Sequence, residues 1–577
     1  MGLFFLTTEA GGREQQAQVE AALLAGGFLT AWRHHEGELR ISLCRKLNGG
    51  GGLLVKGDNG DFAIATGTLI YRGQTGTAAL KSFLDAFAPG ETLWRGTQGI
   101  WSAVLRKEGR VYLVNDQLNS DKIYCDAGQR VFSNSFIALC EAGKAGAGSV
   151  DDQGSYEYVW NGAAFGTKTF FSGIRSLPNN TVAVVDGGNT KLLHIGHGYR
   201  LEPMPRGIPP DSVAEACNAK LKRLFSIYSA KWPRNVRSAL SGGYDSRLLL
   251  ALLLDSGMQP ALFVYGNTEA RDVQVAKEIC TGEGLAISHI DKQRHAPAPV
   301  DAFRGIIDAN VIAFDGWKYD GLFDGGIDLA DRLARSKNGA PLMNGSVGEV
   351  FRNFFYLRDT PYSIRQLVHT FYSRYSPKAC TARFDRDAYE ETVVADIAHA
   401  IGAPARGLLP RQAIEMVYPL FRGRYWTARD AAINQRFGTA LYPFLEPTIF
   451  DGTWNIPFGL KNLGRLEARM IARLAPRLAQ YPSDYGFAFS SDPPWRYRAT
   501  MEINNWRPAA LRKFSYRLQH RQPQHRPYYL QRAYLSKVID TGFPYMRRLF
   551  NIRWLHEAEA FNRVCTIEYL CQRYGVG

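Results

Sequence analysis

The 577-residue sequence lacks several features that would place it in familiar classes of protein. Its longest apolar run, residues 248–254, ends at Asp255 and is far shorter than the roughly 20 residues that span a bilayer. The start, "MGLFFLTTEAGG", has no basic residues ahead of its short apolar stretch, as a secretory signal would have. The eight cysteines form no CxxC pair, so neither a zinc cage nor a disulfide framework is expected. We therefore expect a cytoplasmic protein without a membrane-spanning segment.

The sequence is not short of positive charge, and its net charge is +15. Part of this excess lies in "RPAALRKFSYRLQHRQPQHRPYYLQR", residues 507–532, where arginines alternate with aromatic residues. This composition is typical of a surface for an acidic peptide, a carrier protein or a nucleic acid. The alternative, which we favour, is a solvated helix and loop whose aromatic residues pack inward.

Two main units are expected. Residues 1–190 contain short alternating stretches such as "GIWSAVLRKEGRVYLVNDQ" (99–117), which predict antiparallel hairpins in a β-rich sandwich. A Pro- and Gly-containing segment at 194–212 predicts the boundary. Beyond it, "NVRSAL", a leucine-rich helix and "ALFVYG" predict a strand–helix–strand unit of a parallel α/β sheet, and the pattern after about residue 300 is mostly helical.

The turn "SGGYDS", residues 241–246, lies between the first of these strands and the helix. A turn of small residues at a helix N-terminus presents backbone N–H groups to an anion, here a phosphate. Gly242 and Gly243 allow close approach, and Ser241 and Ser246 offer hydroxyl groups. Asp245 would repel a bare phosphate, so a magnesium ion is implied. The Walker sequence GxxxxGK[ST] does not occur, and the alternative is a tight turn without a ligand.

The turn resembles the pyrophosphate-binding loop of the asparagine synthetase family, which includes β-lactam synthetases and lasso-peptide cyclases. Looser similarities follow in the family's order: "VYLVNDQLNSDKIYCD" (111–126), "VFSNSFIAL" (131–139), "FFSGIRSLPNN" (170–180), "LMNGSVGEVFRNFFY" (342–356), "ALYPFLEPTIFDGTWNIP" (440–457) and "YPSDYGFAF" (481–489). The resemblance implies an α/β protein with an Ntn-hydrolase-like β-rich sandwich at 1–200. It implies a PP-loop ATP-pyrophosphatase domain, similar to adenine nucleotide alpha hydrolases, at 210–577, with a helical C-terminal part. Such enzymes use ATP and Mg²⁺ to adenylate a carboxylate, and an amine then displaces AMP.

Departures from the family pattern refine this expectation. The glutaminase half of the family begins, after loss of Met1, with a nucleophilic cysteine, and this chain has Gly2 there. We therefore expect a degenerate glutaminase domain and an amine supplied by a substrate, as in β-lactam synthetases or peptide cyclases. The family's second magnesium-binding aspartate is replaced by Gly348-Glu349, and we expect Glu349 to be the ligand; the alternative is a surface residue or helix cap. The late-loop lysine is replaced by Asp484, with Arg496 and Arg498 as candidates for its role.

Four further positions complete the predicted site. The resemblance implies that Val264 and Gly266 line adenine through the backbone, and that Asp272 contacts ribose or magnesium; its alternative is an N-cap. Arg247, in the first turn of the helix, is expected either to clamp pyrophosphate or a substrate carboxylate or to reach solvent.

Other functions stay open at this stage. One is asparagine synthesis itself, with glutamine or ammonia, and another is a catalytically dead binding relative. A tRNA-modifying ligase with the same type of loop is disfavoured by the similarity of the N-terminal half to asparagine synthetase.

Overall fold

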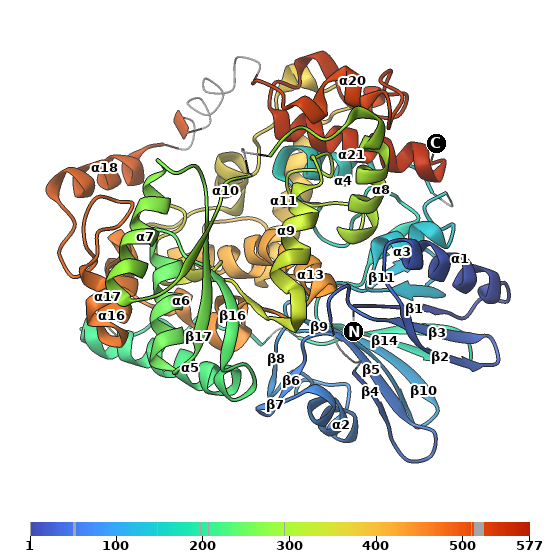
Figure 1. Ribbon diagram of the computed structural model, residues 1–577, viewed down its shortest axis with the longest axis horizontal. Helices are drawn as coiled ribbons and strands as arrows, with labels where there is room; N and C mark the ends of the chain where they lie inside the picture. The colour runs from blue at the N-terminus through green and yellow to red at the C-terminus, as the bar shows by residue number, and fades with distance from the viewer. Residues whose placement is uncertain are drawn as a thin grey trace.

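The structure is a computed structural model that describes residues 2–49, 53–146, 148–196, 198–205, 207–292, 295–508, 511–512 and 524–576 (Figure 1). Within these ranges, no helix combines the length and the apolar character needed to cross a membrane.

The N-terminal region contains two six-stranded antiparallel sheets packed face to face. The first sheet has the order β13 (Ile174–Ser176), β11 (Tyr124–Asp126), β12 (Val131–Ser133), β1 (Leu3–Thr7), β3 (Leu39–Cys44) and β2 (Thr30–Glu36). The second has the order β15 (Asn189–His194), β14 (Thr181–Asp186), β10 (Arg110–Asn115), β9 (Trp101–Lys107), β5 (Phe62–Gly67) and β4 (Leu53–Lys56). A small three-stranded sheet has the order β7 (Gln74–Thr75), β6 (Ile70–Tyr71) and β8 (Thr97–Gln98).

The alternation of side chains along β1 explains the layers of this sandwich. Phe4 and Leu6 face the second sheet, whereas Leu3 and Phe5 face the opposite way, because successive side chains of a strand point to opposite faces. The outer face of the first sheet packs against α1 (Gly12–Ala25) and α3 (Phe136–Glu141), and that of the second against α2 (Gly76–Ala86). The predicted β-rich sandwich, including the hairpin at 99–117, is confirmed.

The C-terminal region is built on a five-stranded parallel sheet. Its order is β18 (Ile287–Ile290), β17 (Gln259–Tyr265), β16 (Arg234–Ala239), β19 (Leu342–Met343) and β20 (Ala440–Leu441). The predicted strand–helix–strand unit is β16, α6 (Tyr244–Asp255) and β17. The sequence patterns missed β19 and β20, because a strand of two residues shows no alternation.

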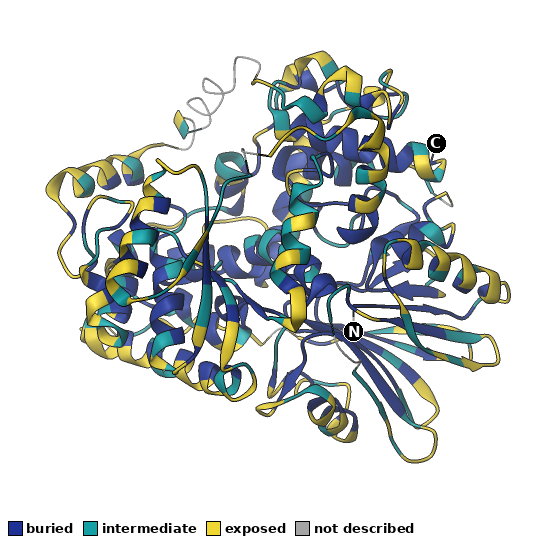
Figure 2. Cartoon of the chain, viewed as in Figure 1, coloured by how far each residue is buried: buried dark blue, intermediate teal, exposed yellow. Residues whose placement is uncertain are grey.

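Helices form most of the elements outside the sheets, and some of them lie well away from the parallel sheet (Figures 1 and 2). They are α4 (Asp152–Asn161), α5 (Pro210–Lys231), α7 (Arg271–Glu283), α8 (Phe303–Ala313), α9 (Ile327–Ser336), α10 (Ile364–Phe371), α11 (Arg386–Ile401), α12 (Arg411–Val417), α13 (Ala428–Phe437), α14 (Pro447–Phe450), α15 (Phe458–Lys461), α16 (Arg465–Leu474), α17 (Pro476–Gln480), α18 (Trp495–Trp506), α20 (Arg532–Leu535) and α21 (Ala558–Tyr574). A π-helical segment, Tyr418–Thr427, joins α12 to α13.

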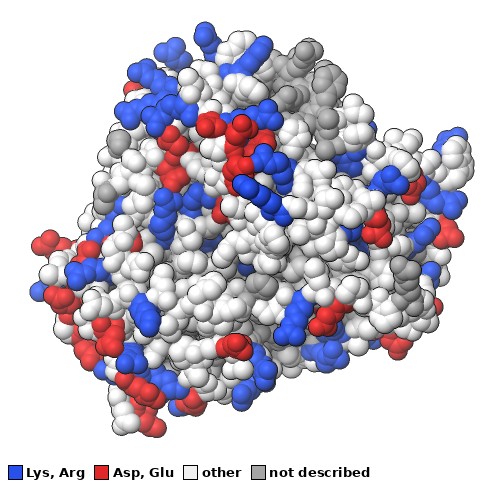
Figure 3. Space-filling model, turned by 180° about the vertical axis from the view of Figure 1, so that it is seen from behind, with Lys and Arg blue, Asp and Glu red and all other residues white. Residues whose placement is uncertain are grey.

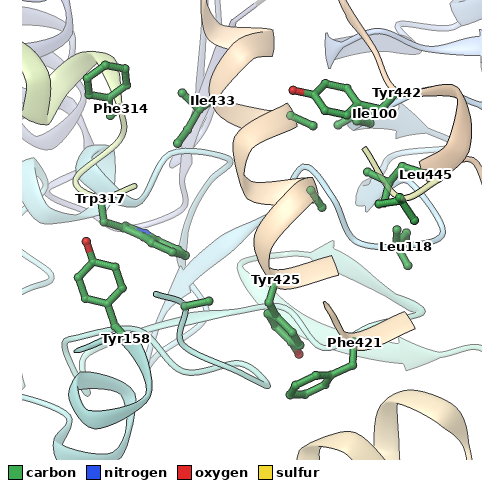
Figure 4. Packing of buried hydrophobic residues seen from close by; sticks show 14 of the residues in the cluster. Ile100, Leu118, Tyr158, Phe314, Trp317, Phe421, Tyr425, Ile433, Tyr442 and Leu445 are labelled. Atoms are coloured by element: carbon green, nitrogen blue, oxygen red, sulfur yellow. The ribbon is translucent and has the colours of Figure 1, made fainter. Parts of the chain in front are cut away.

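The two regions share one hydrophobic core, in which Ile100 and Leu118 of the sandwich lie near Tyr442 and Leu445 (Figure 4). Polar contacts cross the same boundary. The Gly99 N–H donates to both oxygens of Glu446, at 2.9 and 3.0 Å. Strand β15 ends at residue 194 and α5 begins at 210, with no helix or strand among the described residues between them. The proposed domains at 1–200 and 210–577 stay a prediction, and the regions pack as one body of protein.

Candidate functional site

A pocket of about 330 Å³ lies at the carboxyl edge of the parallel sheet. In the sheet, β17 lies on one side of β16 and β19 lies on the other. The loops that follow β16 and β19 therefore diverge at this edge. In open α/β sheets, ligands bind in this kind of crevice. The lining combines the turn at 241–246 with residues 349–356, 462–464 and 484–485 and with α18. The lining includes four carboxylates and one guanidinium: Asp245, Asp272, Glu349, Asp484 and Arg352.

The turn uses its own donors internally. The Ser241 N–H donates to Ser246 Oγ at 3.0 Å, the Gly243 N–H donates to Ser241 Oγ at 3.2 Å, and the two serine oxygens lie 3.0 Å apart. The Gly242 N–H donates to Asp272 Oδ1 at 2.9 Å. In this conformation these three N–H groups donate to side-chain oxygens, and their binding of a phosphate stays a prediction. A phosphate would have to displace side-chain acceptors before it could use them.

Asp245 lies beside an arginine that the sequence analysis did not single out. Arg352 Nη2 donates to Asp245 Oδ1 at 2.6 Å, and Arg352 Nε lies 2.8 Å from Glu467 Oε2. The same guanidinium lies 3.7 Å from Glu349 Oε1 and 5.2 Å from the ring centre of Tyr244. The first turn of α6 thus contributes its carboxylate to a buried ion cluster.

The charges of this cluster do not balance, since three carboxylates surround one cation. Burial raises the pKa of Asp245 to about 7, although the nearby Arg352 guanidinium lowers it. Burial and the charge of Asp245 also raise the pKa of Glu467, whose side chain has no solvent exposure. Burial lowers the pKa of Arg352, but the surrounding carboxylates reverse this effect and raise it well above its usual range. A proton or a further cation would relieve the excess of negative charge.

The residues do not fit the magnesium site that the resemblance implies. A Cβ on Gly348 would lie 2.6 Å from Asp245 Oδ1, so this position has no room for a ligand side chain. Glu349 Oε2 accepts a hydrogen bond of 2.5 Å from the Tyr418 hydroxyl, and Asp245 is paired with Arg352. Among the described residues, no three His, Cys, Asp or Glu side chains are placed to hold a metal together. The expected ligands, Asp245 and Glu349, are thus engaged with Arg352 and Tyr418 in this conformation, and their binding of magnesium stays a prediction.

Arg247 packs inside the protein, and its proposed contact with pyrophosphate or a substrate carboxylate stays a prediction. Its side chain is fully buried, so it does not reach solvent. Its guanidinium donates to the carbonyl oxygens of Tyr481 at 2.9 Å and Pro482 at 2.8 Å, and it lies 4.5 Å from the ring centre of Phe489. Burial lowers its pKa to about 10. Arg247 fixes the 481–489 loop against α6 and does not line the pocket.

Asp272 is not the N-cap of α7, because Ala270 occupies that position and has no side-chain cap bond. The Asp272 carboxylate lines the pocket and holds the Gly242 N–H. Val264 lies buried within β17, and the Gly266 carbonyl lies 2.8 Å from His289 Nε2. Neither Val264 nor Gly266 lines the pocket, so their proposed contact with adenine stays a prediction.

The late loop lies directly on the turn. The Asp484 N–H donates to the Gly242 carbonyl at 3.3 Å, and a Cβ on Gly242 would lie 2.9 Å from this nitrogen. Burial, followed by the charge of Asp272, raises the pKa of Asp484. Arg496 and Arg498 are exposed on α18 and do not line the pocket, which leaves Arg352 as its cation.

The sequence offered only a partial signal for these missed residues. Arg352 and Tyr356 belong to the quoted stretch 342–356, three and seven residues after Glu349. Glu467 lies in a helix without any motif, and Tyr418 begins the π-helical segment. The contacts of Arg352 and Glu467 with Asp245 are long-range in the sequence.

Gly2 occupies a closed position in the sandwich. Its N–H donates to the Cys44 carbonyl at 2.9 Å, and a Cβ would lie 2.9 Å from the Arg45 carbonyl oxygen. A cysteine side chain therefore does not fit here without a shift of the backbone. This packing agrees with the expected absence of a nucleophile.

Half of the basic stretch at 507–532 lies outside the described residues, which include 507, 508, 511, 512 and 524–532 of it. Arg512 donates to the carbonyls of Phe355, Tyr356 and Asn504 at 3.0, 2.5 and 2.6 Å. Arg526 lies 3.6 Å from the ring centre of Phe561. These two arginines thus make their contacts within the folded chain. On the face shown in Figure 3, basic and acidic side chains are interspersed.

The comparisons with known proteins assign no function to this site. No family model and no curated relative matches the chain. The structure of the allosteric regulatory enzyme of purine biosynthesis aligns with 53% of this chain and 77% of that chain, at 12% identity and a TM-score of 0.24. Glutamine phosphoribosylpyrophosphate amidotransferase from B. subtilis, complexed with ADP and GMP, aligns with 61% of this chain and 83% of that chain, at 10% identity and a TM-score of 0.24. Scores this low carry no argument about function.

Proposed function

We propose that the protein is an ATP-dependent ligase that adenylates a carboxylate and joins it to an amine. The observation that carries this proposal is the position of the SGGYDS turn, which lies between a parallel strand and a helix N-terminus and lines the pocket at the carboxyl edge of the sheet. Helix N-termini at this edge favour bound phosphate groups.

In the proposed reaction, a carboxylate oxygen of the substrate attacks the α-phosphorus of ATP, and pyrophosphate leaves. An amine then attacks the acyl carbon of the mixed anhydride, loses a proton, and displaces AMP. Ser241 and Ser246 exchange their mutual contact for phosphate oxygens, and Arg352 offers its guanidinium to developing negative charge. Magnesium enters with ATP as part of the substrate, because four carboxylates in the lining would repel the bare nucleotide.

The amine in this proposal comes from a substrate and not from glutamine. The packing around Gly2 supports this choice over glutamine-dependent asparagine synthesis, since the N-terminal region offers no room for a nucleophilic side chain at that position. An intramolecular amide, as in a β-lactam or a cyclic peptide, and an amide between two substrates are both compatible with the pocket.

Pyrophosphate exchange tests this function. Labelled pyrophosphate should enter ATP when the full chain is incubated with Mg²⁺, ATP and a suitable member of a panel of amino acids, N-acyl amino acids and short peptides. Ser246→Ala should reduce the exchange rate at least tenfold, because Ser246 Oγ organises the turn. Ser256→Ala, at the other end of α6, is the matched control and should leave the rate unchanged.

One observation favours a second candidate, a nucleotide-binding relative without catalysis. In the described conformation, Asp245 is neutralised by Arg352 and the N–H groups of the turn are engaged. Saturable binding of ATP in calorimetry, with no exchange for any acid of the panel, would establish this candidate. Absence of both binding and exchange would refute both functions.

A further inference from the structure

The position beside Asp245 already holds a positive charge. We propose that Arg352 is the resident cation of this site, so that the chain binds no divalent ion of its own at Asp245. Any magnesium of the proposed reaction then enters and leaves with the nucleotide. The inference concerns the chain alone and holds or fails independently of the proposed ligase activity.

The first support is the way in which the guanidinium is held. Nη2 contacts Asp245, Nε lies against Glu467 on another edge of the group, and Nη1 lies 3.4 Å from the Tyr485 hydroxyl oxygen. The planar group thus uses three nitrogens on three partners. Arginine suits such a site, since its charge does not depend on pH and its donors are fixed in one plane.

The second support is the close packing at Asp245 Oδ1, the oxygen that accepts from Arg352. Magnesium requires oxygen ligands at about 2.0–2.1 Å in a near-octahedral arrangement. The Gly348 backbone packs against the Asp245 carboxylate so closely that even a Cβ would lie 2.6 Å from Oδ1. The preceding residue, Val347, has a φ of 77°, which is a costly conformation for a β-branched residue. The chain therefore holds this close approach in spite of backbone strain.

The third support is the environment of the other two carboxylates. Glu349, the expected second ligand, accepts its short hydrogen bond from Tyr418. Glu467 is completely buried, and its carboxyl group lies against Asp245 and Arg352. Its closest cation is Arg352, at 2.8 Å. The guanidinium of Arg352 offsets the negative charge of this buried group of carboxyls, which holds it between Asp245 and Glu467.

This arrangement predicts what happens when the guanidinium is removed. Arg352→Gln leaves Asp245, Glu349 and Glu467 without their cation, so the vacated space should attract a divalent ion. Binding of Mn²⁺ alone, followed by electron paramagnetic resonance without nucleotide, is the direct measurement. We expect Arg352→Gln to bind one Mn²⁺ at least tenfold more tightly than the wild-type chain.

Three variants locate the effect. Arg352→Lys keeps a positive charge and should behave like the wild type. Arg352→Gln combined with Asp245→Asn should lose the gained affinity, since the main ligand is removed. Arg358→Gln is the matched control, because Arg358 is also an arginine of this segment but is exposed and stacks 3.6 Å from the ring centre of Trp506.

Two outcomes would overturn the proposal. One is equal Mn²⁺ affinity in the wild type and in Arg352→Gln; the other is wild-type Mn²⁺ binding that Asp245→Asn alone abolishes. If Arg352→Gln fails to fold, the double variant Arg352→Gln/Glu467→Gln, which also removes one buried negative charge, is compared with Glu467→Gln in the same way. These measurements use no nucleotide or acid, so a failed exchange assay leaves them intact.

Discussion

Glu446 should make the stability of the whole chain depend on pH. It is buried at the boundary between the two regions, where both of its oxygens accept from the Gly99 N–H and the Tyr228 hydroxyl lies 3.5 Å from Oε1. Burial raises the pKa of Glu446 to about 8, whereas an unperturbed glutamate has a pKa near 4.5. The carboxyl is therefore neutral in the folded protein over a pH range in which the unfolded chain ionises it.

The sign and size of the effect follow from this difference. Unfolding releases a proton from Glu446 between these two pKa values, so its favourable contribution is complete below about pH 4.5 and decreases as the pH rises to about 8. The loss is about 1.4 kcal/mol per pH unit, or roughly 3 kcal/mol between about pH 5 and pH 7.5. With an unfolding entropy of about 2.1 cal/mol/K per residue, a chain of this length changes its Tm by about 1 °C per kcal/mol.

Differential scanning calorimetry of the wild type and Glu446→Gln isolates this contribution. The amide keeps the shape and neutrality of the protonated carboxyl, so the two proteins should melt together near pH 5. At about pH 7.5 the variant should melt about 3 °C higher. Glu38→Gln, on the exposed surface of the sandwich, should follow the wild type at every pH. A gap between Glu446→Gln and wild type that is constant over this pH range would refute the reasoning, since it would mean that Glu446 is ionised in the fold.

Three further variants test other contacts. Gly2→Cys should lower the stability by about 1–3 kcal/mol, because its Cβ meets the Arg45 carbonyl, and should release no glutamate from glutamine; Gly11→Ala, in open space, should be neutral in the same thermal assay. Gly348→Ala should lower the Tm by separating Asp245 from Arg352, whereas Gly459→Ala, with no neighbour within 4 Å, should not; equal melting of the two variants would contradict the close packing. Arg512→Gln should cost about 1–3 kcal/mol in urea unfolding, because three carbonyls lose a charged donor; an unchanged midpoint, like that expected for exposed Arg507→Gln, would remove its structural role.

The sequence predicted those parts of the fold that depend on local periodicity. Alternating residues in β9 and β10 and the leucine-rich run of α6 each bury one face or the whole element, and the structure confirms these elements. Strands β19 and β20 gave no signal, because two residues cannot show alternation. Strand β19 pairs with β16, and β20 pairs with β19; each partner lies about 100 residues earlier in the chain.

The candidate site shows the same limit in its chemistry. The turn at 241–246 is a local pattern, and the structure places it in a pocket. The group that lies beside Asp245 cannot be predicted from the neighbouring sequence. It depends on Arg352, on Glu467 in α16 and on the close approach of Gly348, which are all distant in the chain. A carboxylate in a phosphate-binding turn suggests a metal only when no fixed cation reaches it, and that condition cannot be read from the turn.

The charges of the pocket also connect the two proposals. Four carboxylates and one guanidinium line it, so a bare polyanion meets repulsion, whereas a magnesium-bound nucleotide or a protonated amine meets attraction. A ligase of the proposed kind binds one reactant of each type. A fixed guanidinium beside Asp245 supplies a cation to a phosphate group without adding a second divalent charge that would repel the amine. The replacement of the expected lysine by Asp484 also limits the positive charge of the pocket, because Arg352 is then the cation in its lining.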